Sequence, residues 1–460
     1  MTCLTSEVPV RSRTVQRLAA MRFAGATIAL VGLLAVALLH PTPVSAAPQL
    51  TNASIQTPDP SSLTFRVQIA SDADLASATV NYKILNPSGP SVAGSLRVEV
   101  SGRTADASAK LETRNNERFV PIGTQFTYSW TVVDKNGATT TTAEQPFTFL
   151  DGRFQWQSKS DGRVTVFWYG DNQSNALQAM EAAATSIANN EALLNAKLTY
   201  PIRLVIWRST TDSKAAQQQR GSTFDQQIVT GGARVSPDLL HIYIPNDFVD
   251  VVRHETAHII TKVAGDGTIS NLPSWIDEGT AVYAQVTPGD GYTQDLKRAI
   301  SADTLLRLRN MGAPSNQPNQ VNLFYGESWA IVKFTVDTYG KDKFAGIFKS
   351  VKDGAPIDDA LQSNIGVDQD GLYNAWRKSV GLKTIDFPPI PKASTAGAAQ
   401  ATQPPLGIPT NVTSAGTTGG AVSDAVGAVV PRGQAAVVAT GAVVVALVLG
   451  FLAFRLARKS

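Results

Sequence analysis

The sequence contains few residues of the kinds that carry thiol or redox chemistry. Its 460 residues include one cysteine, Cys3, so the rest of the chain cannot form disulfides, ligate zinc through sulfur or use a thiol nucleophile. Charged residues make up 17%, below the roughly 25% of an average soluble domain, which argues against a wholly disordered, highly charged chain. Only four histidines are present, so any pair of them at a regular spacing is informative.

Positive charge is scarce between the two ends of the chain. The net charge is +3, but residues 1–46 carry +3 and residues 434–460 carry another +3, which leaves −3 on the stretch between them. The basic character therefore belongs to the termini, and the sequence predicts no nucleic-acid partner.

Each end also contains an apolar run. Four arginines precede the run at 23–39, and small residues follow at 44–46, which predicts a signal peptide over 1–46, with an uncleaved N-terminal anchor as the alternative. The 21 uncharged residues 434–454 predict a transmembrane helix, with a buried globular helix as the alternative. The basic tail 455–460 predicts a cytoplasmic C-terminus. We therefore expect a single-pass protein of the cell membrane whose intervening residues lie outside the cytoplasm.

Residues 48–150 have the pattern of an all-β domain. Apolar and polar residues alternate at 65–70, 78–85, 94–100, 125–134 and 145–150, and turn-rich pieces such as 86–90 and 134–137 separate these segments. Strands at this spacing predict an antiparallel sandwich of the immunoglobulin or fibronectin type. Such a scaffold indicates no activity, and its ligand is unknown from the sequence.

From residue 151 the pattern changes to that of an α+β domain, which we place at 151–385. Strands are predicted at 163–170, 202–207 and 239–245, and a helix at 175–198. Further helices are predicted at 247–264, 273–286, 291–302, 326–339, 341–352 and 368–380. Residues 386–433 are rich in Pro, Ala, Thr, Gly and Ser and nearly free of charge, which predicts a disordered stalk.

Two of the four histidines lie four residues apart in the segment His254-Glu255-Thr256-Ala257-His258. On a helix, this spacing places both imidazoles on one face, one turn apart, as a single tetrahedral zinc ion requires. Glu255 then projects beside the pair, where it can reach a zinc-bound water without being a ligand. A chance match on a core helix is the alternative. It would leave two imidazoles on an apolar helix without partners, which is costly.

A third ligand is expected from the segment 272–283, where Pro273 suits the start of a helix. Glu278 falls in the middle of that helix, among the packing residues Trp275, Ala281 and Val282. A carboxylate placed there needs a partner, and zinc would serve. In the alternative arrangement, Glu278 is exposed and Asp277 faces the core.

These residues together resemble a known family. His254-Glu255-x-x-His258, followed after nineteen residues by Glu278 within Trp275-x-x-Glu278-Gly279-x-Ala281-x-Tyr283, resembles the gluzincin metallopeptidases, and more closely the peptidase MA-like families of bacterial surface proteins. The resemblance covers roughly residues 160–382. It implies a zincin-like α+β domain in which His254, His258 and Glu278 bind Zn²⁺ and Glu255 is the general base. The sandwich, the stalk and the apolar run lie outside it.

Two features of the resemblance are open. The oxyanion needs a hydrogen-bond donor, for which we expect Tyr325, with Tyr283 as the competitor; either tyrosine could instead be a core aromatic. Thermolysin-like enzymes often carry an acid one turn beyond the ligand glutamate, but this chain has Val282 there. The partner that orients a ligand histidine must then be Asp277, Asp250, Glu327 or a backbone carbonyl.

His241 lies in the predicted strand just before the zinc helix. A structural role is expected for it, with a fourth zinc ligand as the alternative. Since that strand commonly forms the edge of the cleft in zincins, the segment 241–245 is expected to pair with an extended peptide substrate.

Two functions are consistent with the sequence. The first is a membrane-anchored extracellular zinc metallopeptidase that hydrolyses peptide bonds in a peptide or protein substrate through zinc-activated water. The second is a non-enzymatic surface adhesion or scaffold protein with a degenerate zincin domain. The missing acid favours the second hypothesis, whereas the presence of Glu255 favours the first, because a binding relic needs no base.

Overall fold

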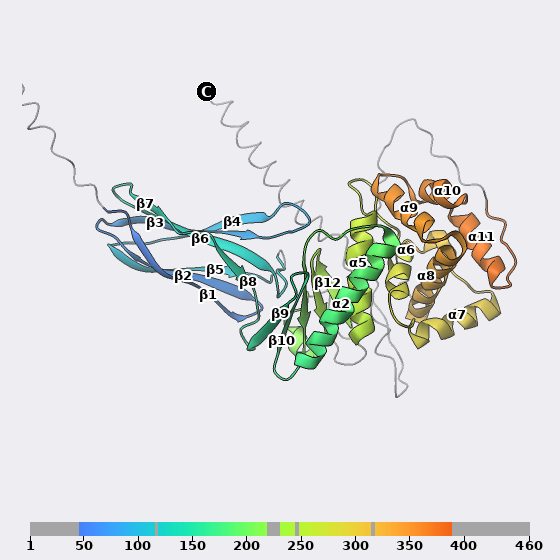
Figure 1. Cartoon of the computed structure of the whole chain (residues 1–460). Helices are drawn as coiled ribbons and strands as arrows, with labels where there is room; N and C mark the ends of the chain where they lie inside the picture. Colours follow the sequence, from blue (N-terminus) through green and yellow to red (C-terminus); the bar gives the residue numbers. More distant parts are fainter. Residues whose placement is uncertain (1–45, 116–117, 219–230, 244–247, 314–317, 389–460) are drawn as a thin grey trace, which may run out of the picture.

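The computed structural model describes residues 46–115, 118–218, 231–243, 248–313 and 318–388. It is a mixed α/β structure with a β-sandwich-like region at the N-terminal end and a mainly helical domain after it (Figure 1). The predicted signal peptide (up to residue 45), the stalk from residue 389, the helix at 434–454 and the tail 455–460 lie outside the described residues.

The N-terminal region consists of two antiparallel sheets. One sheet has the order β1 (Gln49–Asp59), β2 (Ser62–Ala70), β5 (Thr104–Glu112). The other has the order β4 (Val92–Val98), β3 (Leu75–Ile84), β6 (Gln125–Asp134), β7 (Thr139–Thr141), with β8 (Gln145–Thr148) also paired to β6. Every second residue of β2 and β6 is buried, and side chains such as Phe65 and Trp130 fill the space between the sheets. This alternation is what makes each strand half-buried.

The sequence pattern identified the strands with strong alternation but not the others. The segments predicted around β2, β3, β4, β6 and β8 are strands, whereas β1, β5 and β7 were not predicted. β5 is rich in alanine and charged residues, and β1 has no fully buried residue, so neither has the apolar alternation that marks a strand in sequence. Their strand conformation depends on pairing with β2.

A mixed five-stranded sheet follows, in the order β12-β13-β11-β10-β9. Its strands are β9 (Trp156–Ser160), β10 (Val164–Tyr169), β11 (Ile202–Ile206), β12 (Gly232–Ser236) and β13 (Leu239–Ile242). The central strands β10, β11 and β13 are parallel to one another, and β9 and β12 pair antiparallel at the two edges. The prediction that the strand containing His241 forms the sheet edge was therefore wrong. β13 is interior because β12, which lacks a clear apolar pattern, covers its outer side.

Both faces of this sheet are buried, and each belongs to a different core. One face, with Val166, Leu204 and Leu240, packs under the helices. The alternate residues, among them Val205 and Leu239, pack with the sandwich instead. At that junction Gly123 has a φ of +91°, and a Cβ there would lie 2.8 Å from Leu239. The turn around residue 123 therefore needs glycine to approach the sheet, and the sandwich supplies the layer that covers this face.

The rest of the domain is helical. The helices are α2 (Gln173–Leu194), α3 (Thr210–Lys214), α5 (Phe248–Gly265), α6 (Ser274–Tyr283), α7 (Asp290–Ala302), α8 (Pro318–Tyr339), α9 (Lys341–Lys352), α10 (Ile357–Ile365) and α11 (Gln369–Ser379), with the 3₁₀ turn η1 (Leu308–Asn310). α2 and α5 pack against each other and against the sheet, and α6 packs between α5 and α8. The predicted helices are present, but α8 begins eight residues earlier than predicted, at Pro318, and α3 and α10 were not predicted.

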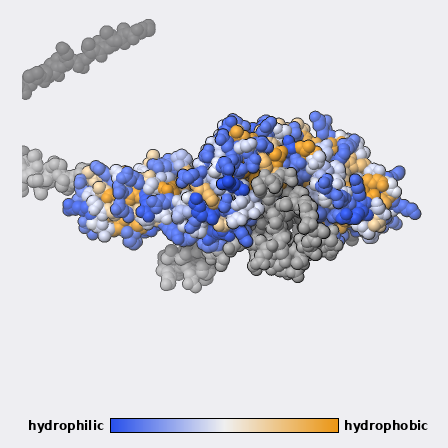
Figure 2. Space-filling model, turned by 90° about the horizontal axis from the view of Figure 1, so that it is seen from below, coloured by the Kyte–Doolittle hydropathy of each residue, from blue (hydrophilic) through white to orange (hydrophobic). Residues whose placement is uncertain are grey.

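The described part of the surface is mainly polar. On the face drawn in Figure 2, hydrophilic residues predominate and the hydrophobic ones form small separate groups. The large hydrophobic residues exposed in the described segments are Val92, Ile269, Val286 and Ile385. None of the helices in these segments is both long enough and apolar enough to span a bilayer.

Candidate metal centre

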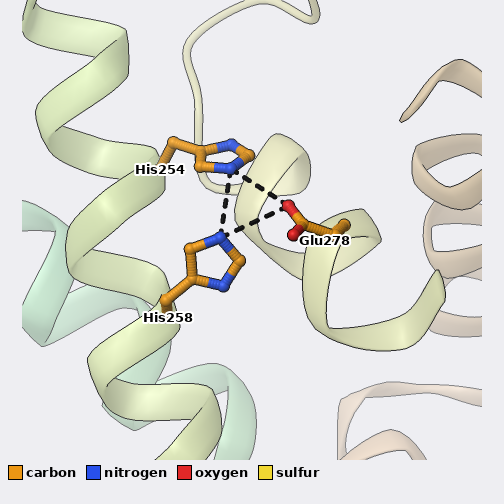
Figure 3. A group of neighbouring side chains, drawn as sticks. All are labelled: His254, His258 and Glu278. Atoms are coloured by element: carbon orange, nitrogen blue, oxygen red, sulfur yellow. Dashed lines mark hydrogen bonds and ion pairs between the residues drawn. The ribbon is translucent and has the colours of Figure 1, made fainter. Parts of the chain in front are cut away.

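Helix α5 carries both histidines of the motif on one buried face. It begins with Asp250 in its first turn and has Lys262 in its last turn, charges that match the helix dipole. The Nε2 atoms of His254 and His258 lie 3.2 Å apart, and both rings face helix α6 (Figure 3). The i, i+4 spacing thus brings the two nitrogens together as predicted.

Helix α6 brings the third predicted residue to the same point. It begins after Pro273, which is its N-cap rather than its first residue, and Trp275 and Val282 anchor it in the core. The Oε2 atom of Glu278 lies 3.3 Å from the Nε2 atoms of both histidines. The arrangement with an outward-turned Glu278 is therefore excluded, and Asp277 is buried as well.

The three atoms fit a divalent metal ion. Their separations of 3.2, 3.3 and 3.3 Å match the ~3.3 Å edge of a tetrahedron around an ion with bonds of about 2.0–2.1 Å. Glu278 Oε2 is buried and faces the two imidazole nitrogens at 3.3 Å, so a cation held between the three atoms would satisfy it. The neighbouring imidazoles outweigh the effect of burial and lower the pKa of Glu278 to about 2, so the carboxylate is ionised.

Glu255 lies next to the two histidines and Glu278, on the side that faces strand β12. Its side chain is buried, and its Oε2 accepts a hydrogen bond of 3.1 Å from the backbone N–H of Arg234 in β12. Burial raises the pKa of this carboxyl above its usual value, and the imidazoles of His254 and His258 oppose the rise. Gly232 makes this contact possible, since a Cβ there would lie 3.1 Å from Glu255 Cγ and 2.7 Å from Val251.

Asp277 orients the second histidine. Its Oδ1 lies 3.0 Å from His258 Nδ1 and also accepts a hydrogen bond from Thr261 Oγ1, while its Oδ2 lies 2.7 Å from Lys262 Nζ. Although burial opposes ionisation, Lys262 and His258 hold the pKa of Asp277 well below its usual value. A carboxylate that accepts from Nδ1–H leaves Nε2 with a free lone pair directed at the metal position.

The other predicted orienting residues differ in their roles. Asp250 does not contact a ligand histidine; its Oδ1 accepts from the backbone N–H of Val286 at 2.9 Å. Glu327 accepts from the backbone N–H of Leu306 at 2.9 Å, away from the metal site, and burial raises its pKa to about 8. His254 is contacted instead by Gln285, whose Nε2 lies 3.2 Å from Nδ1. Gln285 was not predicted. It follows the end of α6, whereas His254 lies on α5, and no spacing within one helix indicates a contact between two elements.

Tyr325 lies beside His254. It lies inside α8, not before a helix start as expected, and its ring centroid is 6.3 Å from that of His254. It stacks on Tyr292 at 5.2 Å, and burial together with Glu278 raises its pKa well above the usual value, so the hydroxyl keeps its proton. Tyr283 is half-buried and packs against the helical core.

His241 has a structural position. It is fully buried on the sandwich side of the sheet, where its Nε2 lies 2.7 Å from the carbonyl oxygen of Ile122. Burial lowers its pKa to about 4, so the ring is neutral. It belongs to the junction between sandwich and sheet and is not part of the His–Glu group.

A protein-family model described as the Peptidase MA superfamily matches residues 182–381. These 200 of the 460 residues run from within α2 to just past α11 and include His254, Glu255, His258 and Glu278. The match supports a zincin-like peptidase domain, and hence a hydrolase, in this part of the chain. No curated protein matches the sequence.

The similarities to solved structures are weaker than the family match. OgpA from Akkermansia muciniphila is 15% identical, with a TM-score of 0.18, over 23% of this chain and only 28% of its own length. An M1 zinc metallopeptidase from Deinococcus radiodurans, solved as a mutant with a Tyr-Ser-Ala substrate, is 11% identical, with a TM-score of 0.31, over 76% of this chain and 96% of its own. An aminopeptidase N family protein from Idiomarina loihiensis is 9% identical, with a TM-score of 0.27, over 74% of both chains. Scores this low do not establish a shared activity.

Proposed function

We propose that the chain is a zinc-dependent peptidase that hydrolyses peptide bonds, with His254, His258 and Glu278 as the zinc ligands and Glu255 as the general base. The observation that carries the proposal is the set of three ligand atoms spaced 3.2–3.3 Å apart, with the buried carboxylate of Glu255 beside them. Three protein ligands leave one coordination position open, as catalytic zinc sites require. The peptidase family match supports the same assignment.

Zinc, when bound, would supply a Lewis acid that activates water and polarises the scissile carbonyl. The residues of this chain then have two roles, which are to transfer the proton of the attacking water and to stabilise the negative charge that develops on the substrate carbonyl. Glu255 takes a proton from the attacking water and delivers it to the leaving amine. Its raised pKa suits the first of these transfers, because a more basic carboxylate accepts the proton from water more readily.

Tyr325 is the proposed donor to the oxyanion that forms on the substrate carbonyl. Its hydroxyl remains protonated well above neutral pH, and the stack with Tyr292 fixes its ring beside His254. A donor held in place before the reaction costs no reorganisation when negative charge develops. The edge strand β12 lies on the other side of Glu255 and offers the sheet edge along which an extended peptide can pair.

The test compares the parent chain with Glu255→Gln. Zinc content and hydrolysis of an unfolded protein substrate are measured for both. We expect the variant to keep its zinc and lose hydrolysis by several orders of magnitude, because the ligands remain and the base is gone. Full zinc occupancy without hydrolysis in the parent, over many substrates, would favour the binding scaffold instead.

We also propose that the domain is held outside the cytoplasm by a transmembrane helix at 434–454. The support is the uncharged run itself, the basic tail after it and the signal-like residues 1–46, all read from the sequence. Fractionation of intact cells, with external protease, tests this: the chain should be found with the membrane and be cleaved from outside. Recovery in the soluble fraction would refute the anchor.

A further inference from the structure

The two ligand histidines have chemically different partners on their Nδ1 atoms. His258 faces the carboxylate of Asp277 at 3.0 Å, which Lys262 and Thr261 support. His254 faces the side-chain amide of Gln285, with Nε2 of the glutamine 3.2 Å from Nδ1. One imidazole is therefore held by a charged acceptor and the other by a neutral group that can either donate or accept.

Gln285 is held in place from both sides of its backbone. Its own N–H donates to the carbonyl of Val282 at 3.2 Å, in the last turn of α6. The N–H of the next residue, Val286, donates to Asp250 Oδ1 at 2.9 Å, and Arg253 Nη1 lies 3.1 Å from that same oxygen. The segment after α6 is thus fastened to the start of α5, which keeps the amide within reach of His254.

The chemistry of imidazole makes the orientation of this amide consequential. With the NH₂ group toward Nδ1, that nitrogen is an acceptor, and the neutral ring carries its proton on Nε2, 3.3 Å from Glu278 Oε2. A histidine that ligates through Nε2 must carry its proton on Nδ1 instead, and that N–H requires an acceptor. Rotation of the glutamine amide by half a turn presents its carbonyl oxygen at the same place.

We propose that Gln285 is a positioning residue for His254. Its side-chain amide, 3.2 Å from Nδ1, would supply through Oε1 the acceptor for Nδ1–H when Nε2 ligates a metal ion. This inference rests on the proposed zinc function. Gln285 does for His254 what Asp277 does for His258. It lies seven residues after Glu278. The position four residues after Glu278, where thermolysin-like enzymes often carry an acid, is occupied by Val282.

A neutral partner also suits the charge of the centre. Three carboxylates, those of Glu255, Asp277 and Glu278, already lie at the centre, and Lys262 pairs with Asp277. A second charged partner on His254 would leave a buried excess of negative charge. Gln285 therefore fixes the tautomer without adding to that charge.

The first measurement is ¹⁵N NMR of the histidine rings in the full-length chain, which has only four histidines to assign. We expect His254 to be the Nδ1–H tautomer with Zn²⁺, with Nε2 as the ligand atom. A zinc-loaded parent whose His254 carries its proton on Nε2 would overturn the role of Gln285.

The second measurement is the zinc dissociation constant by chelator competition. Gln285→Leu should weaken zinc binding about 10–100-fold, the usual cost of removing a partner of a ligand histidine. Gln285→Glu restores an acceptor and should bind zinc at least as tightly as the parent. Gln217→Leu, at a half-buried glutamine that contacts Ser213, is the matched control and should bind like the parent.

Two outcomes separate the possible failures. If the parent binds zinc through His254 and Gln285→Leu binds it equally well, the role of Gln285 is refuted while the proposed function stands. If the parent shows no zinc-dependent change at His254, the proposed function fails as well. Melting of the metal-free variants shows whether each one is folded, and Gln285→Glu tests the role of the acceptor should Gln285→Leu not fold.

Discussion

At the scale of single residues, Asp277 connects His258 to two further side chains beside the proposed ligands. It contacts His258, Thr261 and Lys262 at once, and each contact depends on its negative charge or its two oxygens. The sequence placed it among several possible orienting groups. Only the packing of α6 against α5 shows that it lies beside the second histidine and not the first.

We predict that Asp277→Asn weakens zinc binding about 10–100-fold and lowers the stability of the metal-free protein by about 3 kcal/mol. The neutral amide is a weaker acceptor for His258 Nδ1–H than the carboxylate, and it leaves the mostly buried Lys262 without its main counter-ion. Chelator competition and urea unfolding measure the two effects.

The double variant Asp277→Asn with Lys262→Met separates the effect on zinc binding from the effect on stability. It should recover most of the stability, because the uncompensated charge is gone, while zinc binding stays weak. Recovery of both would mean that Asp277 acts only through Lys262 and does not orient His258.

Glu327 gives a prediction about pH. Burial raises its pKa to about 8, from 4.5, so the native carboxyl keeps its proton across the neutral range. The unfolded chain releases that proton above pH 4.5, so this residue makes the native state progressively less stable as pH rises from 4.5 to 8, by a few kcal/mol in all. Above pH 8 both states are ionised and the dependence stops.

In Glu327→Gln this contribution to the pH dependence should be absent. Urea unfolding at pH 5 and pH 8 measures it: the parent should lose more stability than the variant between the two. Equal losses in parent and variant would show that Glu327 ionises in the folded protein as it does in the unfolded chain.

At the scale of elements, the site depends on how closely β12 approaches α5. The backbone of β12 supplies the hydrogen bond from Arg234 to Glu255, and Gly232 leaves space for that approach. The sequence predicted the helix and the motif on it, because both have a strong local pattern. It did not predict β12, a five-residue strand with no clear alternation, whose place at the sheet edge is set by pairing with β13.

We predict that Gly232→Ala lowers kcat about 10–100-fold and leaves the zinc dissociation constant unchanged. The added methyl group would lie 2.7 Å from Val251 and 3.1 Å from Glu255, so the strand must move away from the helix and release the base. The ligands on α5 and α6 are not displaced. Steady-state kinetics and chelator competition measure the two quantities.

The control is Gly312→Ala, because a Cβ at Gly312 would have no heavy atom of the described residues within 4 Å. It should behave like the parent in both measurements. A Gly232→Ala variant with parental kcat would show that the contact between β12 and Glu255 does not matter for catalysis.

At the scale of the whole molecule, the sandwich and the peptidase part share a core. Five large side chains on one face of the central sheet pack with the sandwich and not with the helices: Phe167, Tyr169, Val205, Trp207 and Leu239. Polar contacts fix the junction, including the buried Arg203, which donates to the carbonyl of Gly123 and pairs with Asp238. The sandwich is therefore a structural layer of the peptidase part as well as a domain of its own.

We predict that residues 151–388 without the sandwich do not form a stable soluble protein, since that apolar face would be open to water. The truncated chain should bind a hydrophobic dye and unfold without a sharp transition, whereas residues 46–388 should unfold cooperatively. Circular dichroism melting and dye fluorescence make the comparison. A truncated chain with the melting temperature and zinc affinity of the longer one would contradict the shared core.

The sequence by itself determined the elements with strong periodicity and the chemistry of the site. An i, i+4 pair of histidines needs only the geometry of one helix, so local sequence fixes it, and the helix with Glu278 follows from its own packing pattern. The tertiary structure decided everything that joins distant segments: Glu278 facing the histidines, Gln285 on His254, β12 at the sheet edge and the sandwich beneath the sheet. These contacts join residues that are far apart along the chain or in different elements, and no local periodicity records them.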